Sequence, residues 1–117
     1  MHDSFDEKRH MRKTSVCVLS FLAMLLAPAW TALASAELAG AKYCMNCHGF
    51  GGRIVGPGYR EIAARRAGEP NADELLARRI RDGSNGEWGT VAMPANAVSA
   101  EDALVLARRI LSLAPSR

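Results

Sequence analysis

The stretch AKYCMNCHGF, residues 41–50, places two cysteines and a histidine within five positions. Cysteine thiols three positions apart can close a small disulfide, bind a metal ion, or form bonds to a covalent cofactor. Each use needs a different complement elsewhere in the chain: a redox-active fold, further metal ligands, or a pocket with a second ligand. The residues around Cys44, Cys47 and His48 therefore decide which chemistry applies.

The N-terminal 36 residues have the layout of a secretory signal peptide. Lysines and arginines between positions 8 and 13 precede an uncharged, apolar stretch at 15–27, and the small residues ALASA follow at 32–36. The apolar stretch is short for a membrane span. The sequence therefore predicts removal of residues 1–36 near Ala36, one domain over residues 37–117, and a periplasmic location. An uncleaved membrane anchor is the alternative.

The predicted mature chain is small and carries little net charge. Its eleven cations and nine acidic groups give a net charge of +2, against +3 for the whole chain. The arginines are not interleaved with aromatic residues, which argues against nucleic-acid binding. The aromatic residues of this part are Tyr43, Phe50, Tyr59 and Trp88. So few large side chains in so short a domain favour a bound group that helps to fill the core.

Apolar spacing and capping residues predict an all-α domain with three to five short helices and no sheet. The expected helices cover residues 36–43, 59–67, a segment between Asn71 and Gly83, and a segment from Ser99 towards Pro115. Asn71 followed by Glu74 predicts a capping box. The irregular stretch at 83–98 is long for a small compact domain, and such loops are usually functional.

Covalent attachment of haem agrees best with this setting. Zinc needs about four cysteine or histidine ligands, and residues 37–117 contain only Cys44, Cys47 and His48. A redox disulfide suits an exported protein, but its Cys-x-x-Cys pattern normally lies near a βαβ unit, and none is predicted. In the haem reading, each thiol bonds one vinyl group and His48 binds the iron.

A haem held in this way needs a second axial ligand to become six-coordinate, commonly methionine or histidine. His2, His10 and three methionines fall in the predicted signal peptide, and Met45 lies between the attachment points. Met93, followed by Pro94 in the long loop, remains. A methionine is often a core filler, but here its position predicts iron ligation, with the loop at 83–98 wrapped around the far side of the haem.

Beyond these residues, the chain resembles the small bacterial class I cytochromes c, which are soluble single-haem electron carriers. The segments that match this family in one register are CMNCHG (44–49), VGPGY (55–59) and RIRDGSNGEWGTVAMPANAVS (79–99). The resemblance implies that the Pro57 carbonyl accepts a hydrogen bond from the haem histidine. It further implies that Arg79 and Trp88 hydrogen-bond a haem propionate. Asn96 is implied to donate to the sulfur of Met93.

Plainer roles stay open for four of these residues. Pro57 can be a turn residue, and Arg79 can lie on a solvated helix face. Trp88 can belong to the ordinary core, and Asn96 can be a hydrogen-bonding loop residue.

Two positions depart from the family pattern. Its first and last helices usually each carry an aromatic residue where they cross, and the matching positions here are Ala39 and Arg109. Leu38 and Ile110 can compensate in part. We expect weaker packing between the terminal helices and a stability that depends more on the haem.

The predicted function is one-electron transfer through iron, without enzymatic activity. Methionine ligation and an apolar pocket both favour Fe(II). The expected pocket residues are Ile54, Val55, Ile62, Leu75, Ile80, Val91, Val98 and Leu106. Respiratory or oxidative redox proteins are expected to dock transiently at the haem edge. The mature protein is expected to be a monomer that binds neither nucleic acid nor membrane.

Three other functions remain as alternatives. The chain can be a small haem c subunit of a larger periplasmic oxidoreductase complex. It can be a thiol–disulfide protein that uses Cys44 and Cys47. A haem peroxidase or gas-binding protein is the third, and it needs an open or labile sixth position on the iron.

Overall fold

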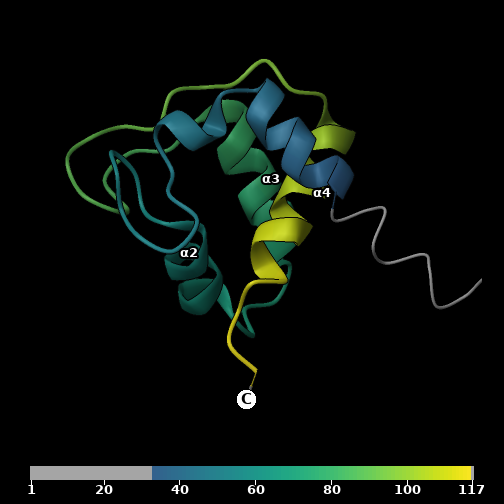
Figure 1. Ribbon diagram of the computed structural model, residues 1–117. Helices are drawn as coiled ribbons and strands as arrows, with labels where there is room; N and C mark the ends of the chain where they lie inside the picture. Colours follow the sequence, from purple (N-terminus) through teal and green to yellow (C-terminus); the bar gives the residue numbers. More distant parts are fainter. Residues whose placement is uncertain (1–32, 117) are drawn as a thin grey trace, which may run out of the picture. The chain divides into compact units, whose positions relative to one another are not determined.

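The computed structural model of the protein describes residues 33–116, which are helical and irregular without a regular strand (Figure 1). Residues 33–41 form a helix, so the helix expected at 36–43 is present and begins upstream of Ala36. Most of the predicted signal peptide, residues 1–32, lies outside the described residues. Within the described range, no helix is both long and apolar enough to cross a membrane.

Four further helical elements follow in chain order. They are the short 3-10 helix η1 (Cys44–Asn46) and the helices α2 (Tyr59–Arg66), α3 (Ala72–Asp82) and α4 (Ala100–Leu111). The helix α4 packs against both α3 and α2 (Figure 1). The stretches at 49–58 and 83–98 contain no helix, as predicted. The predicted all-α class is confirmed.

The helix starts follow the sequence signals in one case and depart from them in another. Ser99 caps α4, because its Oγ accepts a hydrogen bond from the Asp102 N–H at 3.0 Å. The capping box predicted for Asn71 and Glu74 is wrong. Asn71 has a left-handed backbone (φ 56°) and makes no side-chain cap, since a capping side chain reaches the first turn from an extended backbone. The Glu74 N–H donates instead to Asp73 Oδ1 at 3.0 Å.

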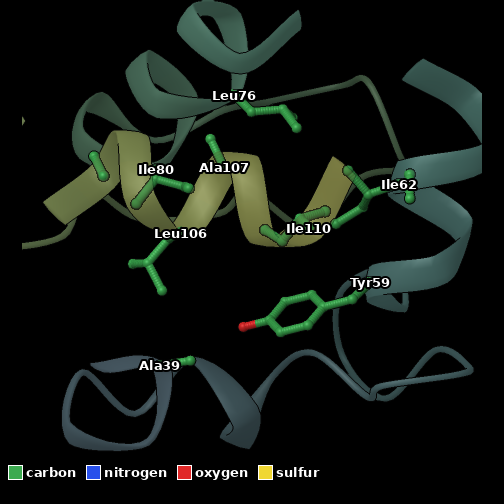
Figure 2. Packing of buried hydrophobic residues seen from close by; sticks show 10 residues of the cluster. Ala39, Tyr59, Ile62, Leu76, Ile80, Leu106, Ala107 and Ile110 are labelled. Atoms are coloured by element: carbon green, nitrogen blue, oxygen red, sulfur yellow. The ribbon is translucent and has the colours of Figure 1, made fainter. Parts of the chain in front are cut away.

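The core lies where α2, α3, α4 and the helix at 33–41 meet (Figure 2). Its buried members are Ala39, Tyr59, Ile62, Ala63, Leu76, Ile80, Ala103, Leu106, Ala107 and Ile110. Alanines on α2 and α4 allow these helices to approach closely. On α3 the buried face is Ala72, Leu76 and Ile80, whereas Leu75, which the sequence analysis had placed in the pocket, is only half-buried.

Neither of the two positions that depart from the family pattern carries an aromatic side chain. Ala39 is buried and points towards Leu106 and Tyr59 (Figure 2). Arg109 is half-buried, and its guanidinium donates to Ser112 Oγ at 3.3 Å. A small side chain, Ala39, therefore lies where the helix at 33–41 meets α4. Leu106 and Ile110 of α4 supply buried apolar surface in this core.

An exposed ion pair joins α3 to α4 and should make stability depend on pH. Arg108 Nε donates to Asp73 Oδ2 at 3.1 Å, and this hydrogen bond lowers the pKa of Asp73. A carboxyl whose folded pKa lies below its unfolded value stabilises the fold above the unfolded pKa and loses that effect as pH falls through the folded pKa. We expect Arg108→Gln to lower the urea midpoint slightly at neutral pH and to leave it unchanged well below the ordinary carboxyl pKa of about 4. Arg109→Gln, on the adjacent residue, is the control, and an equal pH dependence in both variants would contradict the assignment.

Candidate functional site

One apolar cleft collects most of the residues that the sequence singles out. It spans about 1020 Å³ when the solvent space at its open mouth is included. The predicted site residues that line it are Cys44, Cys47, His48, Pro57, Arg79, Trp88 and Met93. Of the apolar residues expected there, Val55, Ile62, Ile80, Val91 and Leu106 line it, while Ile54, Leu75 and Val98 do not. Leu76 lines the cleft and Leu75 does not, because the buried face of α3 consists of Ala72, Leu76 and Ile80.

The segment around η1 brings both thiols to the cleft. The His48 N–H donates to the Cys44 carbonyl at 3.0 Å, which closes a tight turn around Cys44–Asn46. Both cysteines are free thiols. Burial raises the pKa of the Cys44 thiol, whereas redox-active thiols of the Cys-x-x-Cys type have a lowered pKa. The local environment therefore disfavours a thiol–disulfide site. Among the described residues, no cluster of three or more Cys, His, Asp or Glu side chains could hold a metal ion.

His48 is buried, with 8% of its surface exposed, and its ring is held in one orientation. Its Nδ1 lies 2.8 Å from the Pro57 carbonyl oxygen. Because a carbonyl oxygen can only accept, Nδ1 carries the proton and Nε2 keeps a lone pair for a metal. The Tyr59 ring stacks on the imidazole with centroids 5.7 Å apart. A Cβ at Gly56 would come within 2.8 Å of His48 Cε1, so glycine here leaves room for the ring.

Met93 reaches the same cleft from the irregular segment 83–98. Backbone hydrogen bonds join Met93 N to Ser84 O at 2.9 Å and Ser84 N to Met93 O at 3.0 Å. These two bonds close the loop between residues 84 and 93. The preceding Gly83 has φ +81°, and a Cβ there would lie 2.6 Å from the Met93 carbonyl oxygen. The backbone thus fixes the place of Met93 within the loop.

Asn96 fastens this segment to α3 and does not line the cleft. Its Nδ2 donates to the Ile80 carbonyl at 2.8 Å and to the Pro94 carbonyl at 3.1 Å. Both N–H bonds of the amide are therefore used, and the donation to the Met93 sulfur that the resemblance implied is not the arrangement seen. The backbone N–H of Asn96 also donates to the Arg81 carbonyl at 3.1 Å. Asn96 acts as a tie between α3 and the Met-Pro segment.

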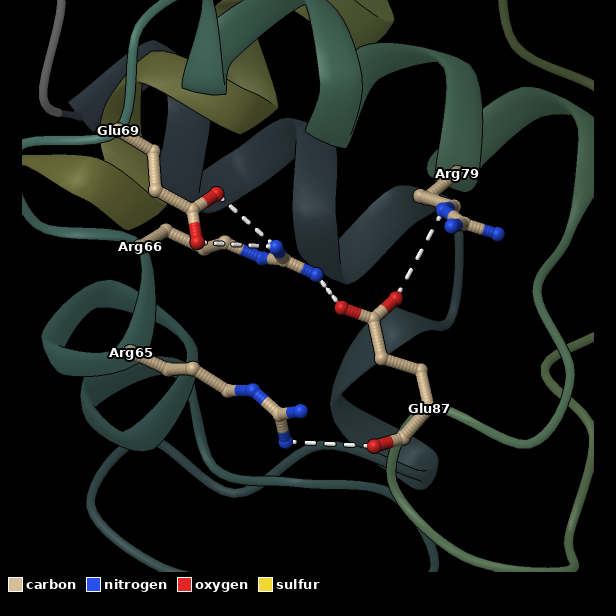
Figure 3. A network of polar contacts seen from close by, with 5 residues as sticks. All are labelled: Arg65, Arg66, Glu69, Arg79 and Glu87. Carbon is tan, nitrogen blue, oxygen red and sulfur yellow. Dashed lines mark hydrogen bonds and ion pairs between the residues drawn. The ribbon is translucent and has the colours of Figure 1, made fainter.

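A network of charged side chains forms one wall of the cleft (Figure 3). Arg66 pairs with Glu87 and, at 2.9 Å, with Glu69. Arg79 Nε lies 3.7 Å from Glu87 Oε2, and Arg65 donates to the Glu87 carbonyl at 3.2 Å. The side chains of Arg66 and Glu87 are only 12% and 16% exposed. The network is thus largely withdrawn from water at its centre.

Sequence reasoning missed several residues of this site. Gly56 and Tyr59 belong to a segment that was singled out, but they were given no role of their own. Arg66 and Glu87 gave no local signal, because arginines occur in each of α2, α3 and α4 and the two residues lie 21 positions apart. They can be recognised as site residues only because the folded chain brings their side chains together.

Comparison with known proteins shows which proteins the chain resembles. The family model for cytochrome c matches residues 32–114. Cytochrome c-551 of Pseudomonas aeruginosa is 46% identical over 71 residues, which cover 61% of this chain and 68% of that protein. Cytochrome c-552 of Nitrosomonas europaea is 42% identical over 95 residues, which cover 80% of this chain and 92% of that protein. The crystal structure of wild-type Nitrosomonas europaea cytochrome c552 superposes with a TM-score of 0.65 at 43% identity, covering 67% of this chain and 98% of that one.

Proposed function

The chain belongs to the cytochrome c family, and on that premise we propose that Cys44, Cys47, His48 and Met93 hold its haem. The protein is a one-electron carrier with one covalently bound haem c, and it is not an enzyme. The bound haem supplies the iron that takes up and releases the electron. What the residues of this particular chain do towards that haem is the subject of the proposal.

The chemistry of the residues at one end of the cleft supports covalent attachment of haem there. Two free thiols reach the cleft beside a buried imidazole whose Nε2 keeps its lone pair. The hydrogen bond from Nδ1 to the Pro57 carbonyl orients the ring and makes it a stronger ligand. Cys44 and Cys47 would form the two thioether bonds, His48 would bind the iron, and Pro57 would position His48. This imidazole geometry is the observation that carries the proposal.

We also assign Met93 as a residue that would bind the haem iron, and Asn96 as the residue that positions its loop. Met93 lines the cleft and is fixed by the backbone pair with Ser84. Arg79 and Trp88, which also line the cleft, would hydrogen-bond a haem propionate. Thioether ligation and an apolar wall both stabilise Fe(II), so this arrangement raises the reduction potential.

An experiment on the exported, purified protein tests the haem site. We expect haem to remain with the polypeptide after denaturing electrophoresis. The oxidised protein should show the weak far-red absorption band of methionine–iron ligation, and the reduced protein should not bind carbon monoxide. Absence of covalently retained haem together with two alkylatable thiols would favour the thiol–disulfide alternative. An intact haem that binds carbon monoxide at once would favour a peroxidase or gas-binding protein.

We further propose that residues 1–36 are a signal peptide cleaved near Ala36 and that the mature carrier is a periplasmic monomer. Transient redox partners follow from its function as an electron carrier, and we propose that they dock at the haem edge. Mass spectrometry of the exported protein is expected to find an N-terminus at Glu37 or Ser35. A chain that starts at Met1 would contradict cleavage. Co-purification in a stable stoichiometric complex would favour a subunit of a periplasmic oxidoreductase over a free carrier.

The glycine beside the Met93 backbone provides a local test of how the ligand is held. Gly83 and Gly86 both have positive φ, but only at Gly83 would a Cβ meet the Met93 carbonyl. Gly86→Ala should cost the strain of a left-handed residue, about 1–2 kcal/mol. We expect Gly83→Ala to lower the thermal midpoint further and to weaken the far-red methionine–iron band, because the Met93 backbone must move. Equal melting and an unchanged band in both variants would show that this contact does not set the place of Met93.

A further inference from the structure

We propose that Arg66 binds a carboxylate of the haem together with Arg79, and that Glu87 positions both guanidinium groups for it. The inference rests on the proposed haem site, since the carboxylate is a haem propionate. It adds Arg66 and Glu87, for which the sequence predicted no role, to Arg79. Figure 3 shows these three side chains, which line the cleft.

The first observation is a pair of buried donors without acceptors. The Nε atoms of Arg66 and Arg79 are both shielded from solvent, and neither has a hydrogen-bond partner. Buried N–H groups are almost always paired in native structures. Both side chains line the same cleft. Two such donors on one wall therefore indicate an acceptor that binds between them.

The second observation is the charge of the cleft wall. The side chains of Arg66, Arg79 and Glu87 are the arginine and carboxylate groups that line the cleft among the described residues. Two cations and one carboxylate line the cleft, and Glu69, just outside the lining, balances the second cation. A carboxylate that enters the cleft therefore meets two guanidinium groups whose Nε–H groups are unpaired, rather than an excess of positive charge.

The third observation is how the two glutamates hold Arg66. Its Nη1 donates to Glu69 at 2.9 Å and its Nη2 pairs with Glu87, whereas its Nε has no hydrogen-bond partner. Glu87 presents its other oxygen to Arg79 Nε at 3.7 Å, a distance beyond a hydrogen bond. Glu87 thus anchors both guanidinium groups and leaves their Nε edges able to receive a second carboxylate. A planar guanidinium suits this shared use, because it offers five N–H donors in fixed directions.

The adjacent Arg65 provides a matched control. Its guanidinium lies 4.4 Å from the centroid of the Trp88 ring and donates to the Glu87 backbone carbonyl. Arg65 does not line the cleft and is exposed. Replacing it removes the same charge from the neighbouring position of α2 without removing an Nε edge from the cleft.

The test follows proton binding by the haem propionates in the loaded protein. The probes are the pH dependence of the reduction potential and the NMR signals of the propionate methylene groups. A neighbouring cation holds a carboxylate ionised, so Arg66→Gln should increase the proton affinity of one propionate about tenfold or more. Arg65→Gln should change it little. Equal changes in the two variants would overturn the proposal.

A double variant separates direct binding from simple charge balance. Arg66→Gln combined with Glu87→Gln removes one cation and one anion. If Arg66 only neutralises Glu87, the propionate returns to its wild-type proton affinity, and the proposal fails. If Arg66 binds the propionate, the raised affinity persists. Should Arg66→Gln not accumulate, Arg66→Lys keeps the charge but lacks the Nε edge, and a wild-type proton affinity in that variant would also overturn the proposal.

Failure here is distinguishable from failure of the proposed haem site. Covalent haem and the far-red methionine–iron band test the ligands in the wild-type protein and in every variant. If both are present while Arg66→Gln behaves like Arg65→Gln, only the role of Arg66 is wrong. If the wild-type protein retains no covalent haem, the ligand assignment itself is wrong.

Discussion

Replacement of either attachment cysteine by alanine is expected to remove most of the covalently bound haem. Each thiol would form one of two thioether bonds, so Cys44→Ala or Cys47→Ala leaves only one thiol to react and should weaken or block haem attachment during maturation. The haem would also fill the apolar cleft, and the buried core that remains is built mainly from alanine, leucine and isoleucine. Because loss of the haem would leave this cleft unfilled, we expect the free energy of unfolding to fall by at least the roughly 3–5 kcal/mol that loss of one large buried aromatic side chain costs.

Haem staining after denaturing electrophoresis and intact mass measure the effect. Met45→Ala is the matched control, since Met45 lies in η1 between the two cysteines and leaves both thiols in place. The control should retain wild-type haem. Full covalent attachment in both single cysteine variants would contradict thioether bonding.

Met93→Ala should have the second large effect, and it should act on the iron rather than on attachment. Haem should remain covalently bound, the sixth position should open, and the reduced protein should bind carbon monoxide. The potential should fall by on the order of 0.1 V, because axial ligands tune haem potentials over about 0.8 V and a thioether favours Fe(II).

Val91→Ala is the control for Met93→Ala, because Val91 belongs to the same loop and lines the same cleft. Redox titration and carbon monoxide spectra of the two variants give the comparison. Val91→Ala should leave the sixth position closed. An unchanged potential in Met93→Ala, with no carbon monoxide binding, would mean that another residue binds the iron.

The fold was predictable where local signals act alone. The apolar spacing of residues 100–111 and the Ser99 cap place α4, and Gly83 ends α3, as the sequence predicts. The capping box at Asn71 failed because residue type does not reveal a left-handed backbone. Leu75 was expected in the pocket, but the adjacent Leu76 lines it, because apolar residue type alone does not tell which of two neighbouring leucines faces the core.

The sequence predicted those residues of the site that belong to short recognisable motifs. The segments around Cys44, Pro57 and Met93 were singled out from the sequence, and the structure brings them to one cleft. Asn96 differs from expectation because its amide finds carbonyl acceptors on α3 that only the tertiary fold supplies. The pairing of Arg66 with Glu87 was invisible for the same reason.

The segment that carries Met93 is fastened by backbone groups on both sides. Ser84 pairs with Met93, Asn96 is tied to α3, and Lys42 donates to the Ala97 carbonyl at 3.0 Å. His48 is held just as firmly by Pro57 and Tyr59. Two residues held in this way would shift little when the haem iron that they bind gains or loses an electron. The nuclear rearrangement that limits electron exchange is then small, so the carrier can exchange electrons quickly with partners that stay bound only briefly.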